Sequence, residues 1–257
     1  MPQWDPAQYE RHKRDRDRPA LDLMLQIPRD LKPRVIWDLG CGTGEHAAVL
    51  AVRHPAAEVR GLDSSEQMLA RGRERNTTAS WVQGDIAAFD PPRPPDLIFT
   101  NAALQWLGDH DSLFPRLVGT LQPGGVFACQ MPLSHGAPMH AAIRETVADG
   151  PWAARLKGVR GVRPVADPAD YYGWLSPLAE VDIWSTTYLH VLTGDDPVVD
   201  WMLGTGLRPM LQALDDDAER AAFVAAYRAR VRVLFPRRDD GTTLFPFPRL
   251  FIVARRY

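Results

Sequence analysis

The sequence has few cysteines, no long apolar run and no net positive charge, and each of these absences excludes a class of protein. Its 257 residues include two cysteines, Cys41 and Cys129, whose spacing fits neither a disulfide framework nor a zinc site. No window approaches the roughly 18 apolar residues of a membrane span, and the charged first residues do not form a secretory signal. The net charge of −2 gives no general attraction to nucleic acid. We therefore expect a cytoplasmic monomer with neither nucleic-acid nor membrane partners.

The first half of the chain alternates short apolar segments with helical ones. A helix is expected over 44–53, and Ser64, with Gln67 three residues on, is a candidate N-cap for the next helix. Near-continuous apolar strands between helices are typical of a parallel sheet that helices cover on both faces. The expected strands are 35–39, 59–62, 81–83, 96–100 and 126–131.

The second half adds two expected strands, 181–192 and 249–256, joined by the long segment 193–248 with helical patterns. So much helix between two strands implies a cap rather than a tight hairpin. The predicted fold is α/β: a Rossmann-like, seven-stranded, mostly parallel sheet with helices on both faces, an antiparallel last strand and a helical cap. We expect one domain, 1–257. Its cofactor-binding core is 31–132, and its cap or substrate elements are 1–30, 133–180 and 193–248.

The strongest signal is the segment Asp38-Leu-Gly-Cys-Gly-Thr-Gly44, between an expected strand and an expected helix. Glycines allow a sharp turn and a close ligand approach. A dinucleotide enzyme would show G-x-G-x-x-G/A, but Glu45 stands at the last position. Asp63 ends the second strand, where a carboxylate accepts both ribose hydroxyls, and Asp85 ends the third, within reach of an adenine amino group. The alternative is a purely structural turn with aspartates that cap helices.

Further motifs are spread over nearly the whole chain. They are Trp4-Asp-Pro-x-x-Tyr9, Arg16-Asp-Arg-Pro19, Asp63-Ser-Ser65, Asn101-Ala-Ala-Leu-Gln-Trp106, Gln130-Met-Pro132, Val181-Asp-Ile-Trp184, Thr186-Thr-Tyr-x-His190, Gly206-Leu-Arg-Pro209 and Phe247-Pro-Arg-Leu-Phe-Ile-Val-Ala-Arg255. The order of motifs over 35–131 resembles the class I methyltransferases. Together with the motifs of the second half, it resembles the trans-aconitate 2-methyltransferase family, which forms a monomethyl ester of a tricarboxylate. The stretch 152–167 departs from the family pattern.

The resemblance implies S-adenosylmethionine as cofactor and a small polycarboxylic acid as methyl acceptor. A carboxyl group with a pKa of about 4 is already ionised at neutral pH, so we expect neither a general base nor a metal. The expected cofactor residues are Tyr9, Arg18, Asp38, Gly40, Gly42, Asp63, Ser64, Met68, Asp85, Ile86, Asn101 and Ala102. The expected substrate residues are Trp106, Arg144, Tyr188, His190, Arg208 and Arg249.

Arginine suits the acid because its planar fork pairs bidentately with carboxylates. Arg208 and Arg249 stand among apolar neighbours, where a guanidinium needs a partner such as a substrate. The alternative is a buried structural ion pair. Likewise, His190 could be an ordinary core histidine, and Trp106 could serve packing alone.

Two other functions remain open from the sequence. One is a carboxyl methyltransferase that acts on a malonyl thioester held by a carrier protein, which needs a basic docking surface. The other is a protein that binds S-adenosylmethionine without catalysis. The sequence Asn101-Ala-Ala lacks the Asn-Pro-Pro-aromatic motif of amide and adenine N-methyltransferases, which argues against such nitrogen acceptors.

Overall fold

The computed structural model describes residues 13–75, 77–133, 136–159 and 165–257. These residues form two compact units. The sheet unit comprises residues 18–132, 165–186 and 250–257. The helical unit comprises the described parts of 1–17, 133–164 and 187–249. The chain passes between the units several times, and the two longest strands, β6 and β7, contribute residues to both.

The seven-stranded sheet has the order β3-β2-β1-β4-β5-β7-β6. Neighbours from β3 to β5 pair in parallel. The last strand runs the opposite way: Arg256 N donates to Gly125 O, and Leu133 N donates to Pro248 O, each over 2.9 Å. The predicted mostly parallel sheet with an antiparallel last strand is thus confirmed. The strands are β1 Val35–Leu39, β2 Glu58–Asp63, β3 Ser80–Gln83, β4 Leu97–Asn101, β5 Val126–Pro132, β6 Ala179–Thr193 and β7 Thr242–Arg256.

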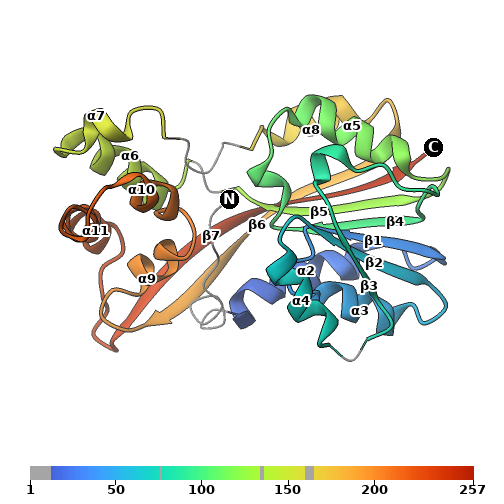
Figure 1. The fold of residues 1–257 in the computed structure, drawn as a ribbon, viewed down its shortest axis with the longest axis horizontal. Helices are drawn as coiled ribbons and strands as arrows, with labels where there is room; N and C mark the ends of the chain where they lie inside the picture. The colour runs from blue at the N-terminus through green and yellow to red at the C-terminus, as the bar shows by residue number, and fades with distance from the viewer. Residues whose placement is uncertain (1–12, 76, 134–135, 160–164) are drawn as a thin grey trace. The chain divides into compact units, whose positions relative to one another are not determined.

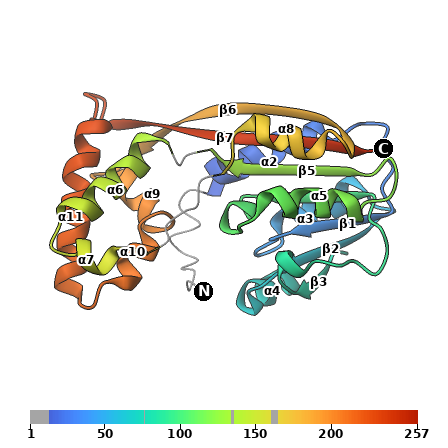
Figure 2. The ribbon, with the colours of Figure 1, turned by 90° about the horizontal axis from the view of Figure 1, so that it is seen from above.

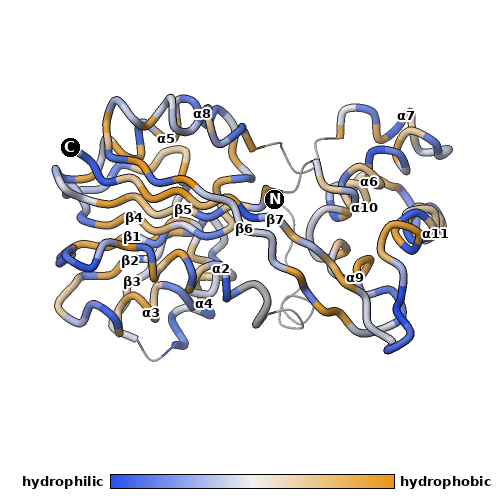
Figure 3. The backbone as a smooth tube through the Cα atoms, turned by 180° about the vertical axis from the view of Figure 1, so that it is seen from behind, coloured by the Kyte–Doolittle hydropathy of each residue, from blue (hydrophilic) through white to orange (hydrophobic). Residues whose placement is uncertain are grey.

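Helices cover both faces of the sheet within the sheet unit. On one face lie α2 (Lys13–Gln26), α3 (Glu45–Arg53) and α4 (Glu66–Arg73), and on the other lie α5 (His110–Thr120) and α8 (Pro168–Leu175) (Figure 1). The central strands are correspondingly apolar along their length (Figure 3), and every residue of β1 is buried. Double coverage explains why their sequences do not alternate between polar and apolar residues.

The helical unit has a hydrophobic core of its own. It contains α6 (Pro138–Asp149), α7 (Ala153–Leu156), α9 (Pro197–Leu203), α10 (Arg208–Ala213) and α11 (Asp217–Leu234), all visible in Figure 2. Trp201, Phe223 and Phe245 are buried in this core, and the Tyr227 hydroxyl donates to Met139 O over 3.2 Å.

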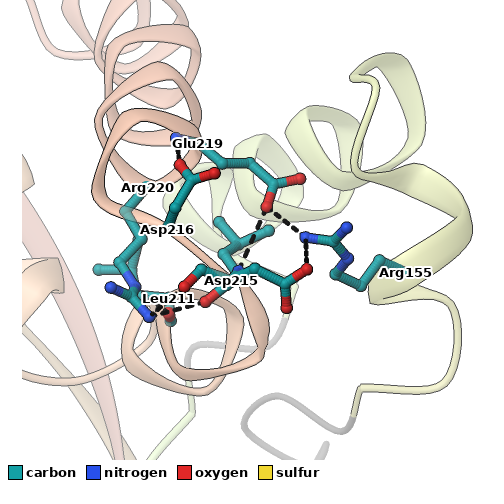
Figure 4. Close-up of polar contacts among 7 residues, drawn as sticks. Arg155, Leu211, Asp215, Asp216, Glu219 and Arg220 are labelled. Carbon is teal, nitrogen blue, oxygen red and sulfur yellow. Dashed lines mark hydrogen bonds and ion pairs between the residues drawn. The ribbon is translucent and has the colours of Figure 1, made fainter.

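Charged contacts tie α7 and α10 to the start of α11 (Figure 4). Arg155 of α7 pairs with Glu219 and, over 2.8 Å, with Asp215. Arg220 donates to the carbonyl oxygens of Leu211 and Leu214. Exposed pairs of this kind each contribute about 0–1 kcal/mol, so the apolar core is the main source of this unit's stability.

Two local predictions need correction. The N-cap of α4 is Ser65 rather than Ser64, since Ser65 has an extended backbone and its Oγ accepts from Met68 N over 3.3 Å. The last strand begins at Thr242 rather than 249. Pro246 and Pro248 disguise its first half, because proline lacks the N–H of a regular ladder. The alternating Phe245 and Phe247 are nevertheless buried.

No helix in the described parts of the chain is both long enough and apolar enough to cross a membrane.

Candidate functional site

The turn after β1 packs against the residues that follow β4. Gly40 has a φ of +73°, a conformation that side chains disfavour, and its N–H donates to Leu62 O over 2.8 Å. A Cβ on Gly40 would lie 2.3 Å from the Cβ of Ala103. Only glycine therefore allows this turn to close against the chain beyond β4.

The ring of Trp81, in β3, packs directly on the backbone at three glycines. A Cβ would lie 2.0 Å from the ring at Gly44, 2.7 Å at Gly61 and 3.2 Å at Gly72. These glycines come from the start of α3, from β2 and from α4. This packing was not predicted from the sequence. Its signal was the presence of glycine inside a strand and inside a helix, where glycine is unfavourable.

The carboxylate of Asp63 joins two turns. Its Oδ2 accepts from Gly42 N over 2.8 Å, and its Oδ1 accepts from Ser65 N over 2.9 Å. A carboxylate offers about four lone-pair sites, so each oxygen can accept a second hydrogen bond. The predicted ribose contact is therefore compatible with these backbone contacts.

The loop after β3 is held by a hydrogen bond within the loop itself and by hydrogen bonds from helix α5. Asp85 Oδ1 accepts from Ala87 N over 2.8 Å, at the start of the 3₁₀ turn η1 (Ile86–Ala88). From α5, Arg116 donates to the carbonyl oxygens of Phe89 at 2.7 Å, Ala87 at 2.9 Å and Ile86 at 3.1 Å. Arg116 thus fixes the loop that carries the predicted adenine contacts Asp85 and Ile86. Nothing in the sequence distinguished it from an ordinary helix-surface arginine.

Asp38, in β1, is a buried carboxyl group with an open acceptor. It is 1% exposed, and within the described residues its Oδ2 has no hydrogen-bond partner. Burial raises the pKa of Asp38 to about 7; the Ala47 N–H opposes this shift and the Asp63 charge adds to it. An approaching cation would be paired by this carboxylate.

Strand register brings Asp38 to the same face of the sheet as Asn101. Asp38 pairs with Phe99, and Asn101 follows two residues later in β4. Asn101 Oδ1 is also buried and has no partner in the described chain. Next to it, Ala102 has a φ of +53° and its N–H donates to Gln130 O over 2.9 Å.

Of the other predicted cofactor residues, Met68 lies beside the glycine turn, with its Cε 3.4 Å from the position of a Cβ on Gly42. Ser64 O accepts from Gln83 Nε2 over 3.3 Å. Arg18 has a 73% exposed side chain that lies 3.8 Å from Asp22. Tyr9 lies outside the described residues. The cofactor contacts of all these residues stay predictions.

The amino-acid sequence of the chain also matches those of known methyltransferases. Residues 36–125 match the family model described as a methyltransferase domain. The sequence is 47% identical to a curated protein of Azoarcus sp. (strain BH72) named trans-aconitate 2-methyltransferase. The alignment spans 257 residues and covers the whole of both chains. The chain belongs to the trans-aconitate 2-methyltransferase family.

Solved structures share the fold at much lower identity. The YcgJ protein from Bacillus subtilis matches with a TM-score of 0.63 at 16% identity, over 93% of this chain and 98% of that one. The phosphoethanolamine N-methyltransferase 2 of Haemonchus contortus, in complex with S-adenosyl-L-methionine, matches with a TM-score of 0.56 at 16% identity. This match covers 93% of this chain and 53% of that one. These likenesses support the Rossmann-like methyltransferase fold.

Most of the predicted substrate residues of this family member lie in the helical unit. Tyr188, His190 and Arg249 are 6%, 5% and 4% exposed. The His190 ring centroid lies 6.3 Å from that of Phe247, and the Arg249 guanidinium lies 4.5 Å from the same ring. His190 and Arg249 therefore both neighbour one aromatic side chain.

The remaining three substrate predictions are more accessible. Arg208 is the half-buried first residue of α10, and Arg144 is exposed on α6. Trp106 belongs to the sheet unit, where it ends the turn η2 (Leu104–Trp106) and is 40% exposed. Their contacts with substrate stay predictions.

Proposed function

We propose that this chain transfers a methyl group from S-adenosylmethionine to a carboxylate of trans-aconitate. The observation that carries the proposal is the 47% identity, along the whole of both chains, with a relative of that name. The site supports it independently, because it offers the groups that the cofactor needs.

The chain's own residues fit the cofactor piece by piece. Gly40 and Gly42 both have positive φ and carry no Cβ, which suits a turn whose backbone a ligand approaches closely. Asp63 ends β2 and Asp85 lies two residues beyond β3, and their carboxylates suit ribose and adenine as hydrogen-bond acceptors. Asp38 Oδ2 and Asn101 Oδ1 are buried acceptors that suit the ammonium group of the methionine.

When bound, S-adenosylmethionine supplies a methyl group on a positively charged sulfur. The acceptor oxygen takes the methyl carbon, and the electron pair of the broken carbon–sulfur bond stays on sulfur. No proton moves, so no residue has to act as a base. The residues of the site instead hold and align the acid and exclude water. Arg249, Arg208 and Arg144 are the candidates that hold the acid.

We also infer a small-molecule enzyme that works as a cytoplasmic monomer, without nucleic-acid or membrane partners. Cys41 and Cys129 are buried free thiols, which suits a reducing compartment. Light scattering of the purified protein checks the monomer.

The decisive experiment offers the enzyme labelled S-adenosylmethionine with a panel of di- and tricarboxylates and a malonyl thioester on its carrier protein. We expect base-labile label on trans-aconitate above all others. Label on the malonyl carrier alone would favour the carrier-dependent function, and cofactor binding without turnover on any acid would favour a non-catalytic role.

Asp63→Ala is expected to weaken binding of S-adenosylhomocysteine at least about tenfold. The variant loses an ionic acceptor for ribose, worth about 1.5–3 kcal/mol, together with the contacts to Gly42 and Ser65. Calorimetry measures the affinity. Glu66→Ala, at an exposed carboxylate of the adjacent helix, serves as the control and should bind like the parent. Unchanged affinity in Asp63→Ala would remove this residue from the site.

The raised pKa of Asp38 predicts pH-dependent cofactor binding. If only the ionised carboxylate pairs with the ammonium group, a pKa of about 7 makes the affinity for S-adenosylhomocysteine rise about fifteenfold from pH 5.5 to pH 7. Asp38→Asn should bind more weakly and lose this dependence. The unfolded carboxyl group ionises near pH 4, whereas the folded Asp38 has a pKa of about 7, so the parent loses stability as the pH rises from about 4 to about 7. The full loss persists at pH 8, so Asp38→Asn should also melt higher there. A parent affinity that stays flat over this range would contradict the prediction.

A further inference from the structure

Gln130, in β5, is a buried amide that the proposed function does not yet use. Its side chain is 0% exposed, and neither Oε1 nor Nε2 has a hydrogen-bond partner among the described residues. The other residues of β5, whose sequence is VFACQMP, are all apolar. Leaving a buried polar group unsatisfied destabilises a protein, and such groups are normally paired. A ligand is one partner that would account for keeping glutamine here.

The register of the sheet places Gln130 on the face of the candidate cofactor site. Gln130 pairs with Asn101 in β4, and Asn101 shares its face with Asp38 in β1. The backbone oxygen of Gln130 also holds Ala102, at the turn after β4. β5 is three strands from β2, which is about 14 Å at about 4.8 Å per strand. Across the sheet, Asp63 in β2 is followed by Asp38 in β1, Asn101 in β4 and Gln130 in β5. Gln130 therefore lies far from the predicted ribose residue Asp63, on the other side of the acceptor atoms of Asp38 and Asn101.

We propose that Gln130 Nε2 donates hydrogen bonds to a carboxylate bound in this site. The inference rests on the proposed function, which brings two carboxylates to the protein: that of the acid and that of the cofactor's methionine. A carboxylate only accepts, so it complements the two N–H groups of the amide.

A neutral donor also suits an attacking carboxylate. It orients the group without the full opposite charge that a guanidinium would place on the reacting oxygen. The amide is already out of water, so only the ligand has to be desolvated on pairing. Because neither amide atom reaches solvent in the structure, neighbouring side chains must shift to admit the carboxylate.

Gln130→Leu separates this role from a structural one. It removes an unpaired polar group from the core, so the melting temperature should equal or exceed that of the parent. The kcat/KM for trans-aconitate, or the affinity for S-adenosylhomocysteine, should fall about ten- to a hundredfold, as for one lost ionic hydrogen bond. Thr100→Val is the matched control. Thr100 is equally buried and its Oγ1 also has no partner in the described chain, but it points to the opposite face of the neighbouring strand. Its kinetics and cofactor affinity should match those of the parent.

Gln130→Glu adds a signature in pH. A protonated carboxyl group can still donate to the ligand, whereas an ionised one repels it. Turnover by Gln130→Glu should therefore fall as the pH rises through a range in which the turnover of the parent does not change.

Calorimetry with S-adenosylhomocysteine and with methylthioadenosine, which lacks the amino-acid part, identifies the carboxylate. In Gln130→Leu, weaker binding of S-adenosylhomocysteine alone assigns Gln130 to the methionine carboxylate. Unchanged binding of both, with a loss in kcat/KM, assigns it to the acid. The proposal is overturned if Gln130→Leu keeps parental kinetics and affinities, or if it melts lower and binds both nucleosides more weakly. If the parent methylates no polycarboxylate, the proposed substrate is wrong, and the S-adenosylhomocysteine titration alone decides the role of Gln130.

Discussion

Arg249→Ala is expected to lower kcat/KM for trans-aconitate by roughly 30-fold to several thousandfold. Arg249 is 4% exposed and lies against the face of Phe247, so a carboxylate that it binds is held away from water. Truncating one partner of a buried, hydrogen-bonded charge pair costs about 2–5 kcal/mol, which corresponds to that range. Initial rates over a range of acid concentrations measure the effect.

Two variants and one binding measurement sharpen this test. Arg249→Lys keeps the charge but loses the planar fork, so it should fall between parent and Arg249→Ala. Arg238→Ala, at an exposed arginine near Asp240 in the same unit, should behave like the parent. The affinity for S-adenosylhomocysteine should stay parental in all three. A lower melting temperature with loss of both ligands would show that Arg249 is structural, and parental kinetics would place the acid elsewhere.

Gly44→Ala is expected to destabilise the protein by about 2–5 kcal/mol. The residue has a φ of +76°, which costs a side chain about 1–2 kcal/mol, and its Cβ would lie 2.0 Å from the Trp81 ring. Overpacking of this kind adds about 1–3 kcal/mol. Urea unfolding measures the change.

Gly124→Ala is the control for Gly44→Ala. Gly124 has a φ of +79°, but a Cβ there meets nothing within 4 Å. It should show the backbone cost without the clash. In addition, Trp81→Leu should be less harmful in the Gly44→Ala background than in the parent, because the smaller side chain relieves the overlap. Equal destabilisation at Gly44 and Gly124 would show that the ring simply moves aside.

The sequence predicted the sheet well where a single pattern decided the structure. Apolar segments that stop at Gly40, Asp63 and Gly84-Asp85 located β1, β2 and β3 along the chain, because turn residues and glycines bound each strand. It failed where geometry beyond the local pattern decided. Ser64 and Ser65 both qualify as an N-cap in sequence, and the contact of Asp63 with Ser65 N accompanies the choice of Ser65.

Packing between distant segments was also invisible to sequence reasoning. Trp81 looks like any strand aromatic until Gly44, Gly61 and Gly72 are found beneath its ring. The core of the helical unit joins residues as far apart as Met139 and Phe247, which no local period reveals. For the candidate site, the cofactor half follows strand ends and was readily proposed. The proposed carboxylate contacts Gln130 and Arg249 are harder to find, because only the folded chain discloses their burial.

The place of β7 in the sheet has a consequence for how the protein is made. β7 follows every other strand in the chain, yet it lies between β5 and β6. While the ribosome has not yet released residues 242–256, one backbone edge of β5 and one of β6 lack their final neighbour. Open edges of apolar strands readily pair with other chains. The nascent protein is therefore most prone to aggregate just before β7 is synthesised. A ribosome that stalls at this point should make the nascent chain more dependent on chaperones.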